Sequence, residues 1–254
     1  MDLYLKGKTV IVTGGGSGLG KGICEAFACE GANVVINYIV DELEVVKFTE
    51  QLNGKYKTDN IAVYGDITKA EEIQSVINKA TDRYRHVDVL VNNAAIRPTT
   101  LLKDMDDNEW DKVIDINLNA AFKFCKRIVN HFLDNKIKGH IVNIISKAAY
   151  SVTSPGHSHY AASKAGMLML TKALANEVAG MGITVNGVAP GIIRTSMMER
   201  KLEDKSLYED YMQRIRIRRL ADEHEVGAIV AFLASERCEL ITGTCVDISG
   251  GMLI

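Results

Sequence analysis

The sequence predicts an α/β fold, a doubly wound parallel sheet of seven strands with helices on both faces. Short runs rich in Val and Ile alternate with amphipathic stretches, and the apolar runs are continuous rather than alternating with polar residues. Continuous apolar runs are typical of strands that are buried on both faces. Strand alternating with helix implies right-handed crossovers within one sheet. Functional groups are therefore expected at the carboxyl edge of that sheet.

Seven apolar runs are the predicted strands: Thr9–Val12, Asn33–Ile36, Ile61–Tyr64, Val87–Val91, Ile141–Ile145, Thr184–Val188 and Cys245–Ile248. In the first stretch between strands, Ile23 and Phe27 share one helical face, and Gly31 follows as a candidate for the C-cap. Only three prolines occur, and no linker rich in Pro and Ser divides the chain. We therefore expect residues 1–254 to form a single domain.

The composition is that of a soluble globular protein. Among 254 residues, 47% are hydrophobic and 24% are charged. The net charge of -2 does not produce a positive electrostatic field that would attract nucleic acid or an acidic membrane surface. Five scattered cysteines with no CxxC pair indicate neither a disulfide framework nor a metal site. No signal peptide and no run of about 18 apolar residues are present. These features predict a cytoplasmic protein with no metal, nucleic-acid or membrane partner.

A glycine-rich loop, Thr13–Gly20, follows the first predicted strand and opens the first helix. Glycines let the backbone approach a pyrophosphate closely, and a helix N-terminus offers free N–H groups to the anion. The loop could also be a turn without a ligand, but its place between strand and helix favours a dinucleotide. The spacing from Gly15 to Lys21 also fits a triphosphate-binding loop. Gly22 stands where that loop needs Ser or Thr, which disfavours hydrolysis of ATP or GTP.

This loop and later motifs resemble those of the short-chain dehydrogenase/reductase family, in the family's order and over nearly the whole chain. The matching features are Gly14-x3-Gly18-x-Gly20, Asn92-Asn93-Ala94-Ala95 for the family's NNAG, Asn117, Ser146, Tyr160-x3-Lys164, Pro190-Gly191 and Thr195. The resemblance implies a Rossmann-like fold and NAD(P)-dependent hydride transfer between carbonyl and alcohol groups. Among members, the chain looks most like the bacterial 3-oxoacyl-carrier-protein reductases and the glucose dehydrogenases.

The resemblance makes Asn117, Ser146, Tyr160 and Lys164 the catalytic candidates. Tyr160 and Lys164 share a helical face, and a nearby ammonium favours a phenolate, so we expect a lowered pKa and acid/base work by Tyr160. Ser146 ends an apolar strand, where its hydroxyl would stabilise developing charge on a substrate oxygen. By resemblance, the backbone of Asn117 holds a water that links Lys164 to solvent. An ordinary Tyr/Lys pair, a turn serine and a structural asparagine are the alternatives.

The resemblance also supplies the cofactor-binding candidates. They are Gly14, Gly16, Ser17, Gly18, Leu19, Gly20, Asn37, Tyr38, Asp66, Ile67, Asn93, Ala94, Ala95, Tyr160, Lys164, Pro190, Gly191, Ile193 and Thr195. Asp66 would meet the adenine amino group, or would instead be the N-cap of the next helix.

Tyr38 stands where NAD-specific relatives carry an acidic residue, which favours NADP(H). Asp41 lies slightly beyond that corner, so NAD(H) stays possible.

Other polar features receive less specific predictions. His157 and His159 flank Tyr160 without a metal motif, and both are interpreted as loop residues, one of which could contact substrate. The run Arg214-x-Arg216-x-Arg218-Arg219 is interpreted as a solvated face or an interface. The charged segment 192–217 after Pro190-Gly191 is expected to be a mobile lid.

The expected substrate is a free, small or medium carbonyl or alcohol compound. Carrier-protein reductases use cationic side chains to bind their acidic partner, and one such arginine lies in the turn after the YxxxK helix, where this chain has Met181. Lys136 and Lys138 could still supply positive charge, which keeps the carrier-linked alternative open. A non-catalytic cofactor sensor is a minor alternative, and an extended-family epimerase or dehydratase would need a longer chain.

A homotetramer is expected from the stretches Asn119–Phe132 and Ala161–Ala179. Phe122, Phe124, Met167 and Met169 lie on different faces of the two predicted helices, which is more apolar surface than one sheet face covers. By resemblance, these helices form the family's main dimer interface, although both could simply be core helices.

Overall fold

The computed structural model of the chain describes residues 1–152, 154–194 and 204–254. Seven parallel strands form the main sheet in the order β3-β2-β1-β4-β5-β6-β9, which confirms the predicted fold class. The strands are β1 (Thr9–Val12), β2 (Asn33–Tyr38), β3 (Ile61–Tyr64), β4 (Val89–Asn92), β5 (His140–Ile144), β6 (Thr184–Pro190) and β9 (Cys245–Ile248). A separate pair of two-residue strands, β7 (Ile193–Arg194) and β8 (Ala221–Asp222), left no pattern in the sequence.

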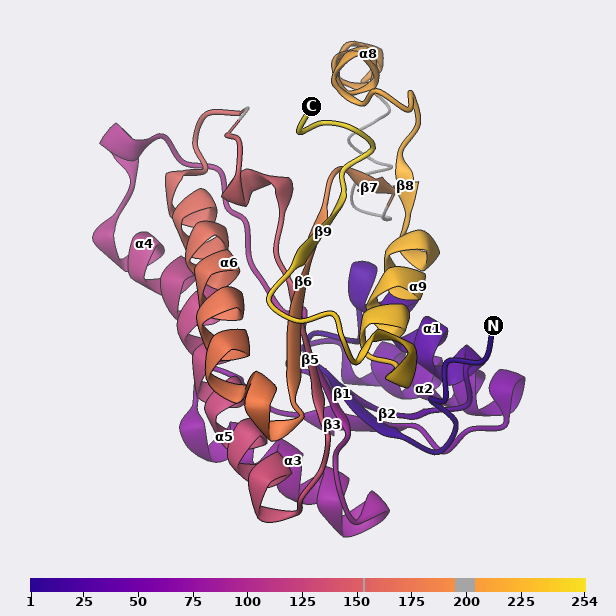
Figure 1. The fold of residues 1–254 in the computed structure, drawn as a ribbon. Helices are drawn as coiled ribbons and strands as arrows, with labels where there is room; N and C mark the ends of the chain where they lie inside the picture. Colours follow the sequence, from indigo (N-terminus) through magenta and orange to yellow (C-terminus); the bar gives the residue numbers. More distant parts are fainter. Residues whose placement is uncertain (153, 195–203) are drawn as a thin grey trace.

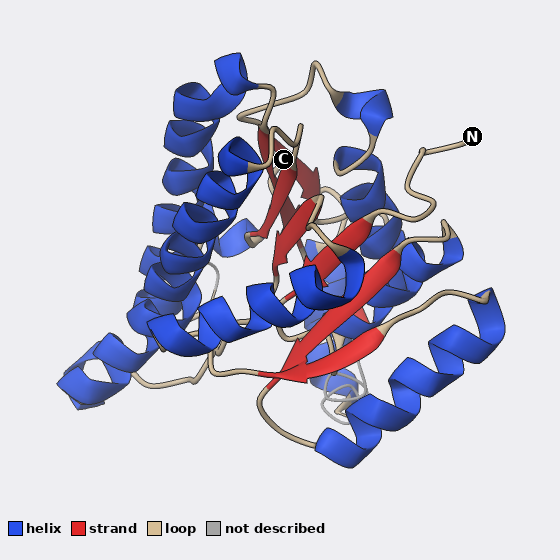
Figure 2. Cartoon of the chain, turned by 90° about the horizontal axis from the view of Figure 1, so that it is seen from below, coloured by secondary structure: helices blue, strands red, loops and turns tan. Residues whose placement is uncertain are grey.

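Helices cover both faces of the sheet (Figure 1). One face carries α1 (Leu19–Cys29), α2 (Glu42–Tyr56) and α9 (Glu223–Leu233), and the other carries α3 (Ala70–Tyr84), α5 (Ala120–Asp134) and α6 (Ser158–Val178). The short helix α4 (Asp107–Ile114) lies beside α6, and α8 (Lys205–Arg214) projects above the sheet (Figure 1). The view from below shows the twisted sheet between its two layers of helices (Figure 2).

Burial on both faces explains why the strands lack alternation. In β1, Val10 and Val12 pack into the core under α1, α2 and α9, whereas Ile11 packs into the core under α3, α5 and α6. All three side chains are fully buried. Successive side chains of a strand point to opposite faces, so both faces select apolar residues here.

The sheet register collects the ends of neighbouring strands at one edge. Val12 of β1 pairs with Ile36 of β2 and with Val91 of β4. Strands β2 and β3 are added on one side of β1, and β4 and the later strands on its other side. This switch in strand order leaves a crevice at the carboxyl ends of β1 and β4, which is where ligands bind in open α/β sheets.

The observed helix ends test two of the sequence predictions, those for Gly31 and His159. Gly31 has φ +80° just after the C-cap of α1, and its N–H donates to Ala28 while that of Ala32 donates to Phe27. These bonds form a Schellman motif, which the glycine permits. The prediction that His159 is a loop residue is wrong, because α6 begins at Ser158 and His159 is completely buried in its first turn.

Two further features bear on the sequence predictions. The expected lid at 192–217 includes β7 and α8, but residues 195–203 lie outside the described residues, and the lid stays a prediction. Within the described ranges, no helix combines the length and apolar character needed to cross a bilayer.

Candidate active site

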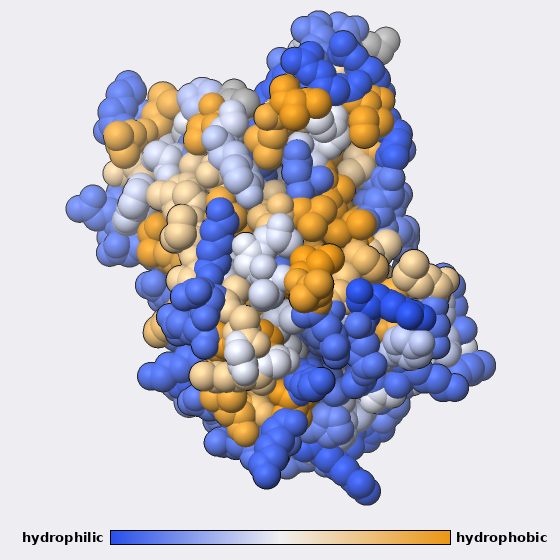
Figure 3. Space-filling view, in the orientation of Figure 1, coloured by the Kyte–Doolittle hydropathy of each residue, from blue (hydrophilic) through white to orange (hydrophobic). Residues whose placement is uncertain are grey.

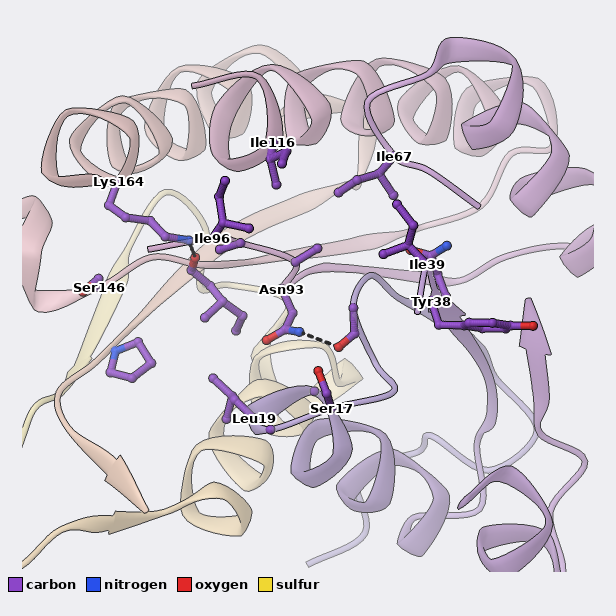
Figure 4. A pocket seen from close by; sticks show the side chains of 18 of the residues that line it. Ser17, Leu19, Tyr38, Ile39, Ile67, Asn93, Ile96, Ile116, Ser146 and Lys164 are labelled. Carbon is purple, nitrogen blue, oxygen red and sulfur yellow. Dashed lines mark hydrogen bonds between the residues drawn. The ribbon is translucent and has the colours of Figure 1, made fainter. Parts of the chain in front are cut away.

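A cavity of about 470 Å³ follows the carboxyl edge of the sheet. Figure 4 shows Tyr38 and Ile39 at one end, Ser146 and Lys164 at the other, and Asn93 between them. Of the cofactor-binding residues predicted from sequence, Thr195 lies outside the described residues, and Gly16 is the one described residue that does not line this first cavity. Sequence reasoning missed the apolar and turn residues of the wall, which are Ile39, Gly65, Thr68, Ile96, Ile116, Ile144 and Ile145.

The glycine loop fits a bound pyrophosphate. Gly14 and Gly18 have φ +63° and +46°. A Cβ on Gly20 would lie 2.2 Å from the carbonyl oxygen of Gly14, so only glycine allows this turn. No side chain caps the start of α1, which leaves backbone N–H groups for an anion. Packing also requires glycine at position 16, since a Cβ there would lie 2.4 Å from Val45.

Asn93 ties together the two strand ends beneath this loop. Its amide nitrogen donates to the carbonyl oxygens of Thr13 at 2.9 Å and Gly14 at 3.2 Å. In return, the Thr13 hydroxyl accepts from the backbone N–H of Asn93 at 2.9 Å and of Ala94 at 3.1 Å. The ends of β1 and β4 are thereby held at a fixed separation along the cavity floor.

The far end of the cavity is built from Asn37, Tyr38 and Asp66. The buried Asn37 amide donates to the carbonyl oxygen of Gly65 at 2.9 Å. The ring of Tyr38 packs edge-on against Tyr64, with centroids 5.9 Å apart. Burial raises the pKa of the Tyr38 phenol, and a hydrogen bond with the Glu42 carboxylate adds to that rise.

Asp66 lines the cavity and is not the N-cap of the next helix, because the residue before α3 is Lys69. One carboxylate oxygen of Asp66 accepts from the backbone N–H of Thr68 at 3.0 Å and from the Thr68 hydroxyl at 2.7 Å. Burial opposes ionisation, but these bonds and nearby Lys69 lower the pKa of Asp66. The alternative that Asp66 caps α3 is therefore wrong, and its turn presents an ionised carboxylate to the cavity.

Tyr160 and Lys164 project from the first turns of α6 at the other end. The ammonium of Lys164 donates to the carbonyl oxygen of Ile144 at 2.7 Å and lies 5.9 Å from the Tyr160 ring centroid. Burial lowers the pKa of Lys164 to about 8.

Burial also raises the pKa of Tyr160, while a hydrogen bond with Ser146 and the positive charge of Arg97 act in the opposite direction. The expected lowering of this pKa is therefore wrong for the chain without cofactor, because loss of solvent outweighs the neighbouring charge.

Asn117 lies behind the cavity wall in a π-helical segment, Asp115–Asn119, between α4 and α5. Its side chain accepts from the backbone N–H of Ile96 at 2.8 Å and donates to the Ile96 carbonyl at 2.9 Å. It also donates to the Ser163 hydroxyl at 3.1 Å. The asparagine thus fixes the strand-end loop against α6, and the wider π-turn is a feature frequently found at functional sites.

A second cavity of about 220 Å³ opens beside Ser146 and Tyr160. The loop after β5, the start of α6, the segment after β6 and the end of α8 all contribute to its wall. Arg97 lines it, and its guanidinium carbon lies 5.6 Å from the Tyr160 ring centroid. His157, one of the two histidines considered for a substrate contact, also lines this cavity.

His159 does not line this second cavity. Its Nδ1 accepts from the backbone N–H of Tyr160 at 2.8 Å, and its Nε2 lies 3.2 Å from Oε1 of Glu109 on α4. It therefore links α4 to the start of α6.

Comparison with known proteins agrees with this geometry. A family model described as enoyl-(acyl carrier protein) reductase matches residues 14–253. The chain belongs to the short-chain dehydrogenase/reductase family. It is 39% identical to the 3-oxoacyl-[acyl-carrier-protein] reductase of Thermotoga maritima, over 99% of this chain and 100% of that one. It is 38% identical to 3beta-hydroxysteroid dehydrogenase 1 of Eggerthella lenta, over 98% and 95%.

A solved short-chain dehydrogenase/reductase of Serratia marcescens superposes with a TM-score of 0.91 at 28% identity, covering 98% of this chain and 99% of that chain. The protein is an oxidoreductase that uses a nicotinamide cofactor to interconvert carbonyl and alcohol groups. When bound, the nicotinamide supplies or accepts the hydride.

Proposed function

We propose that Tyr160 is the acid/base of the reaction and that Ser146, Lys164 and Asn117 assist it. The observation that carries this is the position of Ser146 and Tyr160, which both line both cavities. A substrate oxygen at that junction can contact both hydroxyls. In reduction, Tyr160 donates its proton to the carbonyl oxygen, while Ser146 stabilises the charge that develops there.

Lys164 and Asn117 would hold the proton path in place. The Lys164 ammonium lies on the cofactor side of Tyr160, where it stabilises the phenolate left after proton transfer. Asn117 acts as a positioning residue through Ile96 and Ser163. Its backbone in the π-turn would hold the water that carries a proton between Lys164 and solvent.

We propose a free, small or medium carbonyl or secondary alcohol compound as the substrate. The turn after α6 carries the half-exposed Met181 where carrier-protein reductases have an arginine, which supports a free substrate. The carrier-linked alternative is supported by 39% identity to a 3-oxoacyl-carrier-protein reductase over the full chain. Lys138 also lies beside this turn, since a Cβ on Gly182 would meet its Cγ at 3.3 Å.

The experiment follows cofactor fluorescence for a panel of ketones and alcohols, with NADH and with NADPH, beside a carrier-linked 3-oxoacyl substrate. We expect turnover of free compounds. A carrier-linked substrate preferred in kcat/KM by about a hundredfold, roughly 3 kcal/mol in transition-state binding, would make the alternative the answer. No turnover of any compound would favour a non-catalytic sensor.

We propose NADP(H) as the preferred cofactor. Tyr38, rather than a carboxylate, ends β2, and among the described residues that line the first cavity Asp66 is the one acidic residue. NAD(H) is the second candidate, because the Glu42 carboxylate contacts the Tyr38 hydroxyl and would stand near a ribose 2′ group.

We also propose a cytoplasmic homotetramer. Five unpaired cysteines suit a reducing compartment. Phe124 and Met167 are buried in the core, whereas Phe122 on α5 and Met169 on α6 are 51% and 60% exposed. Hydrophobic side chains also gather over β9 and the C-terminal segment on the face seen in Figure 3. Exposed apolar patches of this kind support association between copies.

A further inference from the structure

The start of α6 is held by two contacts from one neighbouring stretch of helix. Helix α4 lies beside α6 (Figure 1), and together with the π-helical segment that follows it carries both Glu109 and Asn117. Asn117 donates to the Ser163 hydroxyl at 3.1 Å, and that hydroxyl donates to the carbonyl oxygen of Tyr160 at 2.7 Å. Glu109 contacts the ring of His159, which accepts from the backbone N–H of Tyr160. Both backbone polar groups of the tyrosine are therefore connected to the same stretch.

The N–H of Tyr160 needs a partner from outside the regular helix pattern. The first N–H groups of a helix have no acceptor within it, and the bond from Ala161 to the His157 carbonyl, at 2.9 Å, opens the ladder of α6. The side chain of His157, the N-cap residue, makes no capping hydrogen bond. Nδ1 of His159 supplies the acceptor at 2.8 Å. The ring of His159 thus does for Tyr160 what an N-cap side chain usually does.

The two contacts of the His159 ring determine its tautomer. A backbone N–H can only donate, so Nδ1 accepts and carries no proton. The ring proton is then on Nε2, and Oε1 of Glu109, 3.2 Å away, accepts it. His159 is completely buried, whereas 32% of the Glu109 side chain is exposed. The partner of one ring nitrogen sets the role of the other, so Glu109 both orients the ring and selects the tautomer that can bind Tyr160.

The contact acts where small displacements matter to the proposed reaction. Tyr160 lies in the first turn of α6 and lines both cavities beside Ser146. Helix ends fray, and an acceptor for the Tyr160 N–H restrains that turn and the phenol that it carries. A misplaced reacting group can lower the rate by a large factor. Glu109 and His159 themselves line neither of these two cavities.

We propose that Glu109 and His159 are positioning residues for the reaction. Glu109 orients the His159 ring, the ring binds the backbone N–H of Tyr160, and the phenol is thereby held at the junction of the two cavities. This inference rests on the proposed function, since the contact affects turnover through Tyr160 as the acid/base. Loss of the contact should lower kcat and leave KM and cofactor binding nearly unchanged, because neither side chain lines the cavities that receive ligands.

The tautomer is tested first, without turnover. NMR of the protein labelled with ¹⁵N in its histidines observes the ring nitrogens at pH 7.5, and the signals that disappear in His159→Asn belong to His159. We expect a proton on Nε2 and none on Nδ1. A proton on Nδ1 would overturn the inference, because that nitrogen could then not accept from Tyr160.

Turnover is measured next, with the compound of the panel above that the wild type converts fastest. His159→Ala should lower kcat by about tenfold or more, with KM and cofactor Kd changed less than threefold. His159→Asn should keep kcat within threefold of the wild type, because the asparagine Oδ1 stands where Nδ1 stood and can accept the same N–H. Equal kcat values for these two variants would overturn the inference. His131→Ala is the matched control and should keep kcat within threefold, since its ring also accepts a backbone N–H, that of Val87 at 3.0 Å, but lines neither cavity.

Glu109→Ala tests the other contact of the ring, at a partly exposed side chain. It should lower kcat at least threefold in the wild type. In His159→Asn it should lower kcat less than twofold, because the asparagine is too short to reach the carboxylate. Asp111→Ala, exposed on the same helix, is the matched control and should leave kcat unchanged. Equal effects of Glu109→Ala in both backgrounds would contradict a role through the ring.

A double variant separates this inference from the proposed function. In the Tyr160→Phe background, His159→Ala should lower kcat by less than twofold, because the phenol that His159 positions is gone. A further tenfold loss there would show that His159 acts on another group and would overturn the inference. If Tyr160→Phe keeps more than a tenth of wild-type kcat, the proposed function fails. If Tyr160→Phe is inactive and His159→Ala has wild-type kcat, this inference alone fails.

Discussion

The guanidinium of Arg97 lies over the ring of Tyr160, with 5.6 Å between the guanidinium carbon and the ring centroid. Arg97 belongs to the segment after β4, and Tyr160 to the first turn of α6, so the fold alone brings them together. Burial makes the phenolate of Tyr160 costly, and Arg97 offsets part of that cost. The same arginine faces the second cavity. One side chain therefore links the ionisation of the proposed acid/base to whatever binds beside it.

Replacing Tyr160 by Phe should remove the proton donor and retain the ring. We expect kcat to fall by about 10²–10⁴-fold, the range typical of general acid/base groups, with cofactor affinity unchanged within about threefold. Steady-state kinetics and cofactor-fluorescence titration measure the two quantities. Tyr150→Phe is the control, because Tyr150 is half-exposed and lines neither cavity. More than a tenth of wild-type kcat in the Tyr160 variant would show that another group transfers the proton.

The buried ammonium of Lys164 predicts a pH-dependent stability. The pKa of Lys164 is lowered to about 8 in the folded protein, whereas a lysine in an unfolded chain titrates near about 10.4. Between these values the unfolded chain binds more protons, so the free energy of unfolding rises with pH. Relative to Lys164→Met, that of the wild type should rise by up to about 3 kcal/mol over this window.

Denaturant unfolding of the cofactor-free protein at pH 7.5, 9 and 10.5 measures this difference. Lys172→Met, an exposed position on the same helix, is the matched control. A difference between wild type and Lys164→Met that stays flat or falls with rising pH would contradict the burial of a charged lysine.

Gly20→Ala should impair cofactor binding by displacing the glycine loop. The added Cβ would lie 2.2 Å from the Gly14 carbonyl oxygen and 2.9 Å from the Gly15 Cα, and neither backbone atom moves without the loop. We expect the cofactor Kd to rise at least tenfold in fluorescence titration. Gly54→Ala on α2 is the matched control, because its Cβ would meet nothing within 4 Å. It should stabilise its helix by about 0.5–1 kcal/mol and leave Kd unchanged; equal Kd values for both variants would refute the steric argument.

The main sheet was predictable because each strand carries its own signal. Val10, Ile11 and Val12 are all buried, and a continuous apolar run records that burial without knowledge of the neighbours. Boundaries moved where polar residues extend a strand, as at Asn37 and Tyr38 of β2. The two-residue strands β7 and β8 are too short to leave any periodic pattern.

Features that depend on distant partners escaped prediction. His159 follows Pro155 and Gly156, which indicate a loop, but helix α6 starts immediately afterwards and Glu109 reaches the ring from α4. Arg97 carries no local mark of its contact with Tyr160. The motifs of the first cavity were found because the family resemblance names them, whereas the wall of the second cavity comes from five segments of the chain, with Arg97 after β4 among them.

Tyr38 at the end of β2 predicts a preference for NADPH over NADH, and the nearby carboxylate of Glu42 is expected to weaken that preference. We expect a higher kcat/KM with NADPH than with NADH. Glu42→Gln should raise this ratio further, by about twofold to fivefold, because removing an exposed charge beside the 2′-phosphate is worth at most about 1 kcal/mol. Glu44→Gln, exposed in the same first helical turn, is the control and should leave the ratio unchanged. A tenfold preference of the wild type for NADH would refute the proposed NADP(H) specificity.

The exposed apolar side chains of α5 and α6 predict the oligomeric state. Phe122 and Met169 are 51% and 60% exposed, although large apolar side chains gain about 1.5–3 kcal/mol each when they are fully buried. Light scattering at micromolar concentration should therefore give about four times the chain mass of 27.9 kDa.

The double variant Phe122→Asp, Met169→Asp should lower that mass, because two carboxylates per chain would be buried without partners. Leu43→Asp on α2, at a position 86% exposed, is the control for an added surface charge and should leave the mass unchanged. A wild-type chain that scatters only as a monomer would contradict the tetramer, and an intact tetramer in the double variant would move the interface away from α5 and α6, toward the apolar surface over β9.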